Sequence, residues 1–227
     1  MHVWFLVRHT QCNPFWNMAF DEALLKYADS ISAPVLRFYG WQGKPASFGY
    51  FQSYSMVEQL TDLRPLVRRP TSGGLVLHDA DWTYSLVFPP DHWWYKQNAL
   101  QSYKTLHHWH RLSWQRLGIE LELAYESNKI IKGFCFAGPD VFDLVKDNTK
   151  IAGAAQRRSK QGLLIQGSIR PPISNVTRDL WESTFCDVAT GLFEISWQSL
   201  IEPNEILKMA KDLEESKYST LAYNMNR

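Results

Sequence analysis

The sequence predicts an α+β fold in which a mixed, mainly antiparallel sheet is flanked by helices. Strand-like runs follow one another through short turns, which is typical of antiparallel pairing. Helical segments come in a few long pieces and do not alternate with every strand, which argues against a doubly wound sheet. Of the 227 residues, 45% are hydrophobic and 21% are charged, so the chain can form a packed core.

Three segments have the spacing of amphipathic helices. The first is expected to begin at an Asn17 cap, with an apolar face formed by Phe20, Ala23, Leu24 and Tyr27. The second spans about 98–117 and stops at Gly118, with a stripe formed by Tyr103, Leu106, His110 and Leu117. The third follows Pro203 and carries Ile206, Met209, Ala210 and Leu213.

Strands are expected where β-branched and aromatic residues lie between turn residues. Residues 1–8 are expected to form the first strand. The other expected strands are 35–39, 66–69, 75–78, 83–88, 121–124, 134–136, 142–145 and 150–157, and strand-like sequence continues from 157 through a second turn to residue 169. The segment 171–203 is expected to be a connection. We therefore expect one domain over 1–227, in which about 171–227 form a C-terminal connection and a closing helix.

Bulk properties narrow the class of function. The net charge of +1 does not suggest general affinity for nucleic acid. No stretch of the sequence approaches the roughly 18 uncharged apolar residues that a membrane-spanning helix needs. The apolar run at the start of the sequence is interrupted by Arg8, too early for a signal peptide. A cytoplasmic protein without a membrane span is therefore expected. Cys12, Cys135 and Cys186 are odd in number and form no CxxC motif, which argues against a disulfide framework and a cysteine zinc site.

The first candidate binding segment is the loop of residues 68–74, the glycine loop. It runs Arg68-Arg69-Pro70-Thr71-Ser72-Gly73-Gly74 and leads through a short strand to His78 and Asp79. Gly73 and Gly74 let a ligand approach bare backbone N–H groups, so a carboxylate, a thioester carbonyl or a phosphate can sit there. Taken alone, the segment is also compatible with a strand–turn–strand in which a glycine adopts a positive φ.

Cys135 is the candidate nucleophile. It lies between two aromatic residues on a short run that ends at Gly138 and Pro139. A buried cysteine is usually inert, and a reactive one needs a positive partner that stabilises the thiolate. The residues alone leave both interpretations open.

A run of small residues after Lys150 supplies such a partner. Strand alternation predicts that Lys150, Ala152, Ala154 and Gln156 lie on one face. The alanines leave that face almost without side-chain bulk, and Lys150 places a cation at one end of it. A hairpin separates this strand from Cys135, so both side chains can meet on one sheet face. An ammonium at ~4–6 Å would stabilise the thiolate and activate it as a nucleophile. The alternative is a solvated lysine beside a tightly packed sheet.

A histidine cluster at His107-His108-x-His110 is a further candidate, for a metal. On a helix His107 and His110 share a face and His108 does not, and no nearby cysteine or carboxylate completes the set. No metal site is therefore predicted.

Four segments, in order between about residues 13 and 170, resemble the biotin/lipoate protein ligase and lipoyl/octanoyl transferase superfamily. The run 17–25 is similar to its N-terminal helix, and 36–52 to the strand and turn that follow. The loop 68–74 with Val76-Leu77-His78-Asp79 and Thr83-Tyr84-Ser85 resembles its acyl-binding loop. Ser72 stands where glycine is expected; either it fits with a negative φ, or it donates a hydrogen bond to the acyl carbonyl. Residues 150–156, followed by Gly167-Ser168-Ile169, resemble its lysine strand.

Two chemistries are implied by this resemblance. Cysteine-type octanoyltransferases and lipoyl amidotransferases carry a Cys-Phe segment upstream of the lysine strand, as Cys135-Phe136 do here, and form an acyl-thioester on that cysteine. This implies Cys135 and Lys150 as catalytic residues and no required cofactor. ATP-dependent lipoate–protein ligases share the loop and the lysine strand but make an acyl-adenylate with ATP and Mg, and for them Cys135 would be non-essential.

The transferase resemblance also implies partners and binding residues. The donor would be an acyl carrier protein or a lipoylated protein, and the acceptor a lysine of a lipoyl domain or a glycine-cleavage H-type protein. Backbone N–H groups around Gly73-Gly74 and Gly153-Ala154 are candidate oxyanion donors. The expected acyl- and substrate-binding residues are Arg69, Thr71, Ser72, Gly73, Gly74, His78, Asp79, Gly153, Ala154 and Gln156.

Overall fold

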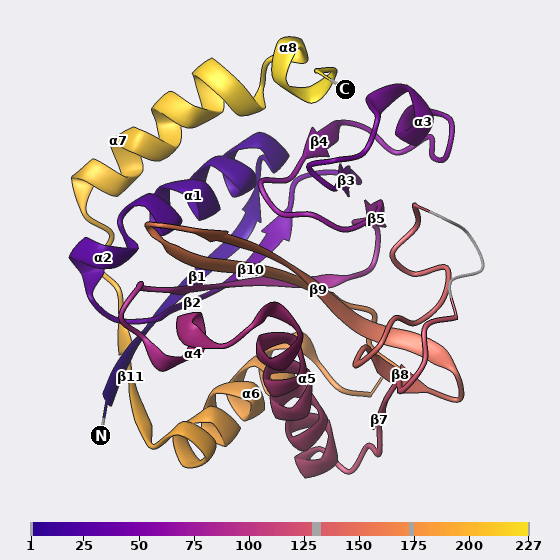
Figure 1. Cartoon of the computed structure of the whole chain (residues 1–227), viewed down its shortest axis with the longest axis vertical. Coiled ribbons are helices and arrows are strands. Elements are labelled where there is room, and N and C mark those ends of the chain that lie inside the picture. The colour runs from indigo at the N-terminus through magenta and orange to yellow at the C-terminus, as the bar shows by residue number, and fades with distance from the viewer. Residues whose placement is uncertain (1, 129–132, 173–174, 227) are drawn as a thin grey trace.

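A twisted central sheet with helices on both faces forms the frame of the molecule (Figure 1). The computed structural model describes residues 2–128, 133–172 and 175–226, and within these residues the sheet has eight strands in the order β11-β1-β2-β6-β10-β9-β8-β7. Strand β1 pairs in parallel with β2 and β11, and the other neighbours pair antiparallel. The predicted α+β class with a mixed, mainly antiparallel sheet is thus confirmed.

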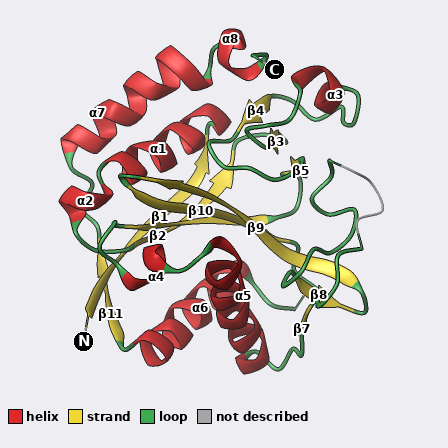
Figure 2. Ribbon diagram, viewed as in Figure 1, coloured by secondary structure: helices red, strands yellow, loops and turns green. Residues whose placement is uncertain are grey.

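The strands of the central sheet are β1 (His2–Cys12), β2 (Val35–Trp41), β6 (Trp82–Phe88), β7 (Glu122–Leu123), β8 (Leu144–Lys146), β9 (Thr149–Ser159), β10 (Gly162–Ile169) and β11 (Ile195–Ser199). A second sheet in the described residues has three strands, β3 (Ala46–Phe48), β4 (Leu66–Arg68) and β5 (Val76–Leu77), in the order β4-β3-β5. It lies beside one end of the central sheet (Figure 2), and Leu75, just before β5, is bridged to Phe134 of the segment 133–143.

Helices α1 (Pro14–Lys26) and α7 (Asn204–Leu213) cover one face of the sheet, and α5 (Ala99–Arg116) and α6 (Arg178–Phe193) cover the other (Figure 1). The shorter helical segments are α2 (Ala28–Ile31), α3 (Tyr54–Glu58), α4 (Trp93–Lys96), η1 (Glu214–Tyr218) and α8 (Leu221–Asn224). No helix among the described residues is long and apolar enough to span a bilayer.

An aromatic core fills the space between the sheet and helices α5 and α6. Trp4, Trp94, Trp109, Trp114 and Trp181 are all fully buried there. Trp109 stacks on Phe185 with ring centroids 3.7 Å apart, which fixes α5 against α6. Much of the tryptophan content of the sequence therefore serves the core behind the sheet.

The boundaries of α5 and α7 follow the sequence signals. Asn98 caps α5 by accepting a hydrogen bond from the Gln101 N–H, and Gly118 follows the helix with φ of +77°. Helix α7 begins directly after Pro203, with Ile206 and Ala210 buried as its periodicity predicts. The second and third predicted helices are confirmed.

The predicted start of the first helix is wrong by one turn. The cap is Asn13, whose side chain accepts from the Phe15 N–H, and Pro14 occupies the first helical position. Asn17 lies inside the helix, buried, and donates to the Gly40 carbonyl. Its polar side chain therefore serves a tertiary contact with β2.

The segment 171–203 is not the connection that its proline and asparagine content suggested. Thr177 caps α6, and the helix buries Trp181, Phe185 and Ala189 against the core. Strand β11 follows and pairs in parallel with the edge of β1. Residues 173–174 lie outside the described residues. The apolar spacing within α6 outweighs the turn-forming residues that flank it.

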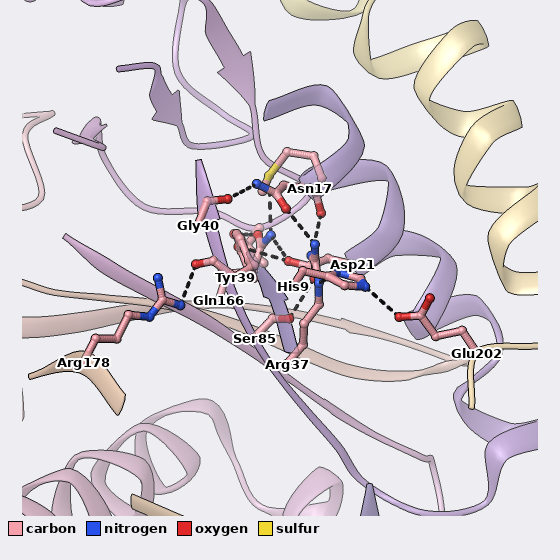
Figure 3. A network of polar contacts seen from close by, with 12 residues as sticks. His9, Asn17, Asp21, Arg37, Tyr39, Gly40, Ser85, Gln166, Arg178 and Glu202 are labelled. Atoms are coloured by element: carbon pink, nitrogen blue, oxygen red, sulfur yellow. Dashed lines mark hydrogen bonds and ion pairs between the residues drawn. The ribbon is translucent and has the colours of Figure 1, made fainter. Parts of the chain in front are cut away.

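A buried polar network ties α1 to the sheet (Figure 3). The Asp21 carboxylate accepts hydrogen bonds from Arg37 at 2.7 Å, from Ser85 at 2.7 Å and from the Gln166 amide at 2.7 Å. Gln166 in turn accepts from the Thr71 hydroxyl at 2.8 Å. One chain of hydrogen bonds therefore runs from the middle of α1, through β10, to the glycine loop.

Candidate active site

The glycine loop and the segment that carries Cys135 are joined backbone to backbone. The Leu75 N–H donates to the Gly133 carbonyl at 2.8 Å, and the Cys135 N–H donates to the Leu75 carbonyl at 3.0 Å. A Cβ on Gly74 would lie 2.5 Å from the Gly133 oxygen, so only glycine allows this approach. The two candidate segments of the sequence form one unit.

The predicted strand over 134–136 is wrong. In the described residues these positions make only a single parallel bridge, between Leu75 and Phe134. Their backbone hydrogen bonds instead join this segment to Leu75, next to the glycine loop. Cys135 therefore reaches the site from a loop rather than from a face of the sheet.

The Cys135 sulfur is half-buried and has a backbone donor. The Gly74 N–H points at Sγ with an N···S distance of 3.0 Å. A hydrogen bond from a backbone N–H stabilises the charged form of a thiol relative to the neutral form. The loop thus supplies an electropositive setting for this sulfur.

Arg69 is buried beneath the loop and holds it in shape. Its guanidinium donates to the Ser47 carbonyl and hydroxyl, each at 2.8 Å, and to the carbonyls of Ser72 at 3.1 Å and Gly74 at 2.8 Å. Burial lowers the pKa of Arg69, and the neighbouring Cys135 sulfur opposes that shift. The arginine predicted to bind substrate lies under the loop, within reach of the sulfur.

Ser72 and Gly73 show how the loop accommodates its departure from the expected glycine. Gly73 takes the positive φ of +92°, and Ser72 is not among the residues with positive φ. Ser72 is exposed, and its backbone carbonyl serves as an acceptor for Arg69. Of the two alternatives for Ser72, the negative φ is confirmed.

Lys150 is buried, and its ammonium is paired with a carboxylate. The Lys150 Nζ lies 2.6 Å from the Asp143 Oδ2, and Tyr103 donates its hydroxyl to the Asp143 Oδ1. The Ala154 N–H donates to the Tyr103 oxygen at 3.2 Å, so this N–H is not free for an oxyanion. Burial, followed by the charge of Asp143, raises the pKa of Tyr103 well above its usual value, so this phenol stays protonated.

The predicted common face of Lys150, Ala152, Ala154 and Gln156 is wrong at Ala152: the other three residues line the outer cavity, and Ala152 does not. The pairing register of β8 and β9 shifts between Leu144 and Val145, which is a bulge. A Cβ on Gly153 would lie 2.5 Å from the Lys150 Cε and 2.6 Å from its Nζ, so the lysine crosses directly over Gly153. Ala152 instead packs into the aromatic core.

Two cavities meet at the candidate nucleophile. The inner cavity is lined by aromatic and small residues, among them Tyr39, Trp41, Val76, Phe136 and Gly153. The wider outer cavity is lined by the glycine loop and by residues of α5 and the 133–141 loop. The residues that line both are Cys135, Lys150, Ala154 and Ala155. The two predicted catalytic side chains thus lie at the junction.

The remaining predicted site residues divide into two groups. His78 lines the inner cavity, stacked on Trp41 with ring centroids 3.9 Å apart, and Gln156 lines the outer one. Asp79 is exposed and lines neither cavity. The carboxylate beside His78 is Asp81, 2.9 Å from Nδ1. Burial raises the pKa of Asp81, but the charge of His78 and hydrogen bonds outweigh it, so the net shift is downward.

Two of the three histidines of α5, His107 and His110, are buried in the core. His107 contacts the Tyr103 carbonyl at 3.1 Å, and His110 contacts the Tyr84 hydroxyl at 2.7 Å. Within the described part of the chain, no group of histidine, cysteine and carboxylate side chains is arranged to hold a metal ion.

Several residues of the site could not be singled out from the sequence. Asp143, Tyr103, Ser47 and Asp81 all contact a predicted site residue or its partner. The available signal was weak: Asp143 lies within the predicted strand 142–145, which a short turn joins to the strand of Lys150. None of the four belongs to a glycine-rich or cysteine motif.

Comparisons with known proteins identify the family of the chain. Residues 13–172 match the model of the lipoyl protein ligase A/B catalytic domain. An octanoyltransferase LipM from Macrococcus caseolyticus is 35% identical over 73% of this chain, and one from Oceanobacillus iheyensis is 37% identical over 76%. The chain spans 65% of the length of these two relatives.

Solved structures show the same fold. Ta0514, a lipoate protein ligase candidate from Thermoplasma acidophilum, aligns over 100% of both chains with a TM-score of 0.81 and 20% identity. A lipoate-protein ligase A bound with ATP aligns over 99% of both chains with a TM-score of 0.81 and 21% identity. Together with the matched family model, these findings show that the chain belongs to the lipoyl protein ligase A/B catalytic domain family.

Proposed function

We propose that this chain transfers an octanoyl or lipoyl group to a lysine of a lipoyl domain or a glycine-cleavage H-type protein, through a thioester on Cys135. The observation that carries the proposal is the position of Cys135 and Lys150 where the two cavities meet, with the Gly74 N–H on the sulfur. An acyl chain in the inner cavity puts its carbonyl at Sγ. The outer cavity then leaves room for the arm of a donor or an acceptor.

The first step forms the acyl-enzyme. The Cys135 thiolate attacks the carbonyl carbon of a donor thioester on an acyl carrier protein, the new S–C bond forms, and the donor C–S bond breaks. The donor sulfur takes up a proton and leaves as a thiol. With a lipoylated protein as donor, an amide C–N bond breaks in the same way and a lysine amine leaves.

The second step delivers the acyl group. A neutral lysine amine of the acceptor attacks the thioester, the amide bond forms, Cys135 departs as a thiolate, and the amine gives up one proton. Lys150, which is paired with Asp143, lines the same two cavities as Cys135 and is our candidate for handling that proton. Among the described residues none accepts a hydrogen bond from the Gly73 N–H, which makes this group our candidate oxyanion donor.

Acyl selection rests on the inner cavity. Apolar burial contributes about 0.8 kcal/mol per methylene, so a medium-length chain gains several kcal/mol before ordering costs. The walls contributed by Tyr39, Trp41, Val76 and Phe136 are suited to that contact. We also include His78, Gly153 and Ala154 among the acyl-binding residues. Arg69 and Thr71 support the conformation of the glycine loop through their buried hydrogen bonds.

Relatives support both the chemistry and the partners. The curated relatives carry the name octanoyltransferase, and one structural neighbour is described as a bipartite lipoate protein ligase with its E2 lipoyl domain. We infer that the chain needs no cofactor and works in the cytoplasm, where a free reactive thiol is kept reduced.

Intact mass spectrometry tests the proposal. The protein is incubated with octanoyl carrier protein, without ATP, and its mass is measured before and after a lipoyl domain is added. We expect an octanoyl adduct that is absent in Cys135→Ser and that disappears when the lipoyl domain gains the same mass. Cys12→Ser is the matched control and keeps the adduct.

An ATP-dependent lipoate–protein ligase is the alternative outcome. Such an enzyme would modify the lipoyl domain only with free lipoate, ATP and Mg, and Cys135→Ala would retain the activity. That result would exclude the thioester route.

A further inference from the structure

A connected group of polar side chains forms part of the inner cavity, which we assign to an apolar acyl tail. This polar wall consists of Trp41, Ser47, His78, Thr83 and Ser168. All five carry an N–H or O–H group, and a donor left free at the cavity would favour water or a polar tail over methylene groups. The partners of these hydrogens therefore decide which tail the cavity accepts.

Three members of the polar wall donate to one carboxylate behind it. Thr83 and Ser168 lie opposite each other in the pairing of β6 with β10, and their hydroxyls donate to the Asp81 Oδ2 at 3.0 and 2.6 Å. The His78 Nδ1 lies 2.9 Å from the same oxygen, and because a carboxylate only accepts, this nitrogen carries a proton. The Asp81 side chain is buried and does not line the cavity.

The other two members donate within the polar wall. The Trp41 Nε1 donates to the Thr83 hydroxyl at 2.7 Å. The Ser47 hydroxyl accepts from Arg69 at 2.8 Å and lies 2.6 Å from the His78 Nε2. In a neutral imidazole with its proton on Nδ1, Nε2 is the acceptor, so Ser47 donates to it. Asp81 thus anchors a set of hydrogen bonds that takes up the donors of all five side chains.

Two further polar side chains of the inner cavity are held from behind in the same way. Tyr39 and Gln166 donate to the buried carboxylate of Asp21 at 3.2 and 2.7 Å, and Asp21 does not line the cavity either. The polar wall therefore contributes oxygen and nitrogen atoms but no free hydrogen. A methylene group loses nothing against such a surface, whereas a ketone oxygen, which can only accept, loses its hydrogen bonds to water and finds no donor there.

We propose that Asp81 is a positioning residue for acyl specificity: it draws the donors of the polar wall away from the cavity, so that an unsubstituted acyl tail is accepted and a tail with a ketone is rejected. This inference rests on the proposed function, because it names the kind of tail that the reaction accepts. Asp81 acts through Thr83, Ser168 and His78 and does not touch the tail itself.

The test compares the binding of octanoate and 7-oxooctanoate by isothermal titration calorimetry at pH 8. Both probes share the carboxylate and the chain length, so the ratio of their dissociation constants isolates the ketone. We expect 7-oxooctanoate to bind about 10- to 100-fold more weakly, which is the effect of burying one carbonyl without a donor. Asp81→Ala leaves three donors without their acceptor, and we expect it to reduce the ratio to below about threefold.

Two more variants separate specificity from stability. Asp81→Asn keeps an acceptor but loses the charge that strengthens its hydrogen bonds, and we expect an intermediate ratio. Glu182→Ala is the matched control, because Glu182 is a buried carboxylate that accepts from Arg8 and Arg178 but lines neither cavity. Its removal is expected to lower stability and to leave the ratio unchanged. Thermal unfolding verifies that each variant is folded.

Equal binding of the two acids by the unmodified protein, or no measurable binding of octanoate, overturns the inference. So does a folded Asp81→Ala with an unchanged ratio. If Asp81→Ala does not fold, Asp81→Asn decides: a ratio at least about threefold smaller supports the inference, and an unchanged ratio overturns it. Binding of the free acids needs no thioester, so a protein that fails to form an octanoyl adduct would refute the proposed function without affecting this measurement.

Discussion

The Lys150 ammonium lies 2.6 Å from the Asp143 carboxylate, and both side chains are buried. Removing one partner of a buried ion pair leaves the other charge uncompensated, which typically costs about 3–5 kcal/mol. We therefore expect Asp143→Asn to lower the free energy of unfolding by about 3 kcal/mol and to slow acyl transfer at least tenfold. Urea denaturation and the octanoyl-transfer assay measure the two effects.

The control for this prediction is the double variant Lys150→Met/Asp143→Asn. It removes both charges, so part of the lost stability should return while transfer stays slow. Equal stability of Asp143→Asn and the unmodified protein would show that the pair contributes nothing to folding.

Gly153→Ala is expected to abolish acyl transfer while the protein still folds. The added Cβ would lie 2.5 Å from the Lys150 Cε, so the lysine must move away from the junction of the cavities. The matched control is Gly191→Ala on α6, where no atom lies within 4 Å of the added Cβ and where alanine should stabilise the helix by about 0.5–1 kcal/mol. Undiminished transfer by Gly153→Ala would contradict the placement of Lys150.

Protonation of the buried His107 is expected to lower the free energy of unfolding in mild acid. Burial lowers its pKa to about 4, below the usual value of about 6.5, so between these values the unfolded chain binds a proton that the folded chain does not. Stability therefore decreases as the pH falls from about 6.5 to 4, by roughly 3 kcal/mol from this residue. His107→Gln should flatten that slope in urea titrations at several pH values, whereas His108→Gln, a less buried site, should retain most of it.

Cys186 should resist alkylation while the protein is folded. Burial raises its pKa to about 12, so almost no thiolate exists at pH 8. Peptide-level mass spectrometry after iodoacetamide treatment should find Cys186 unmodified in buffer and modified in denaturant. Rapid labelling of Cys186 in the folded protein would mean that α6 opens readily.

The parts of the fold that could be predicted are those with local signals. Helix α5 has its cap at Asn98 and its stop at Gly118, and both act through backbone geometry within a few residues. The same kind of signal misplaced α1, because Asn13 and Asn17 are both good capping residues, and the choice depends on Pro14 and on the contact that Asn17 makes with β2.

The parts of the site that could not be predicted depend on register and long-range contact. The bulge between β8 and β9 brings Lys150 over Gly153, and period-two alternation contains no information about such a shift. Asp143 becomes the partner of Lys150 only once that register is set. The glycine loop, by contrast, was recognisable as a unit because its residue types are constrained at adjacent positions.

The hydrogen-bond chain from Asp21 through Gln166 to Thr71 connects the amino-terminal helix to the glycine loop beside the candidate site. Under the proposed function, a variant designed to change the acyl preference should keep these hydrogen bonds, because loss of the contact between Gln166 and Thr71 would remove a support of the glycine loop. Gln166 also lines the inner cavity, so even a conservative change at this residue alters a wall of the cavity together with the support of Thr71.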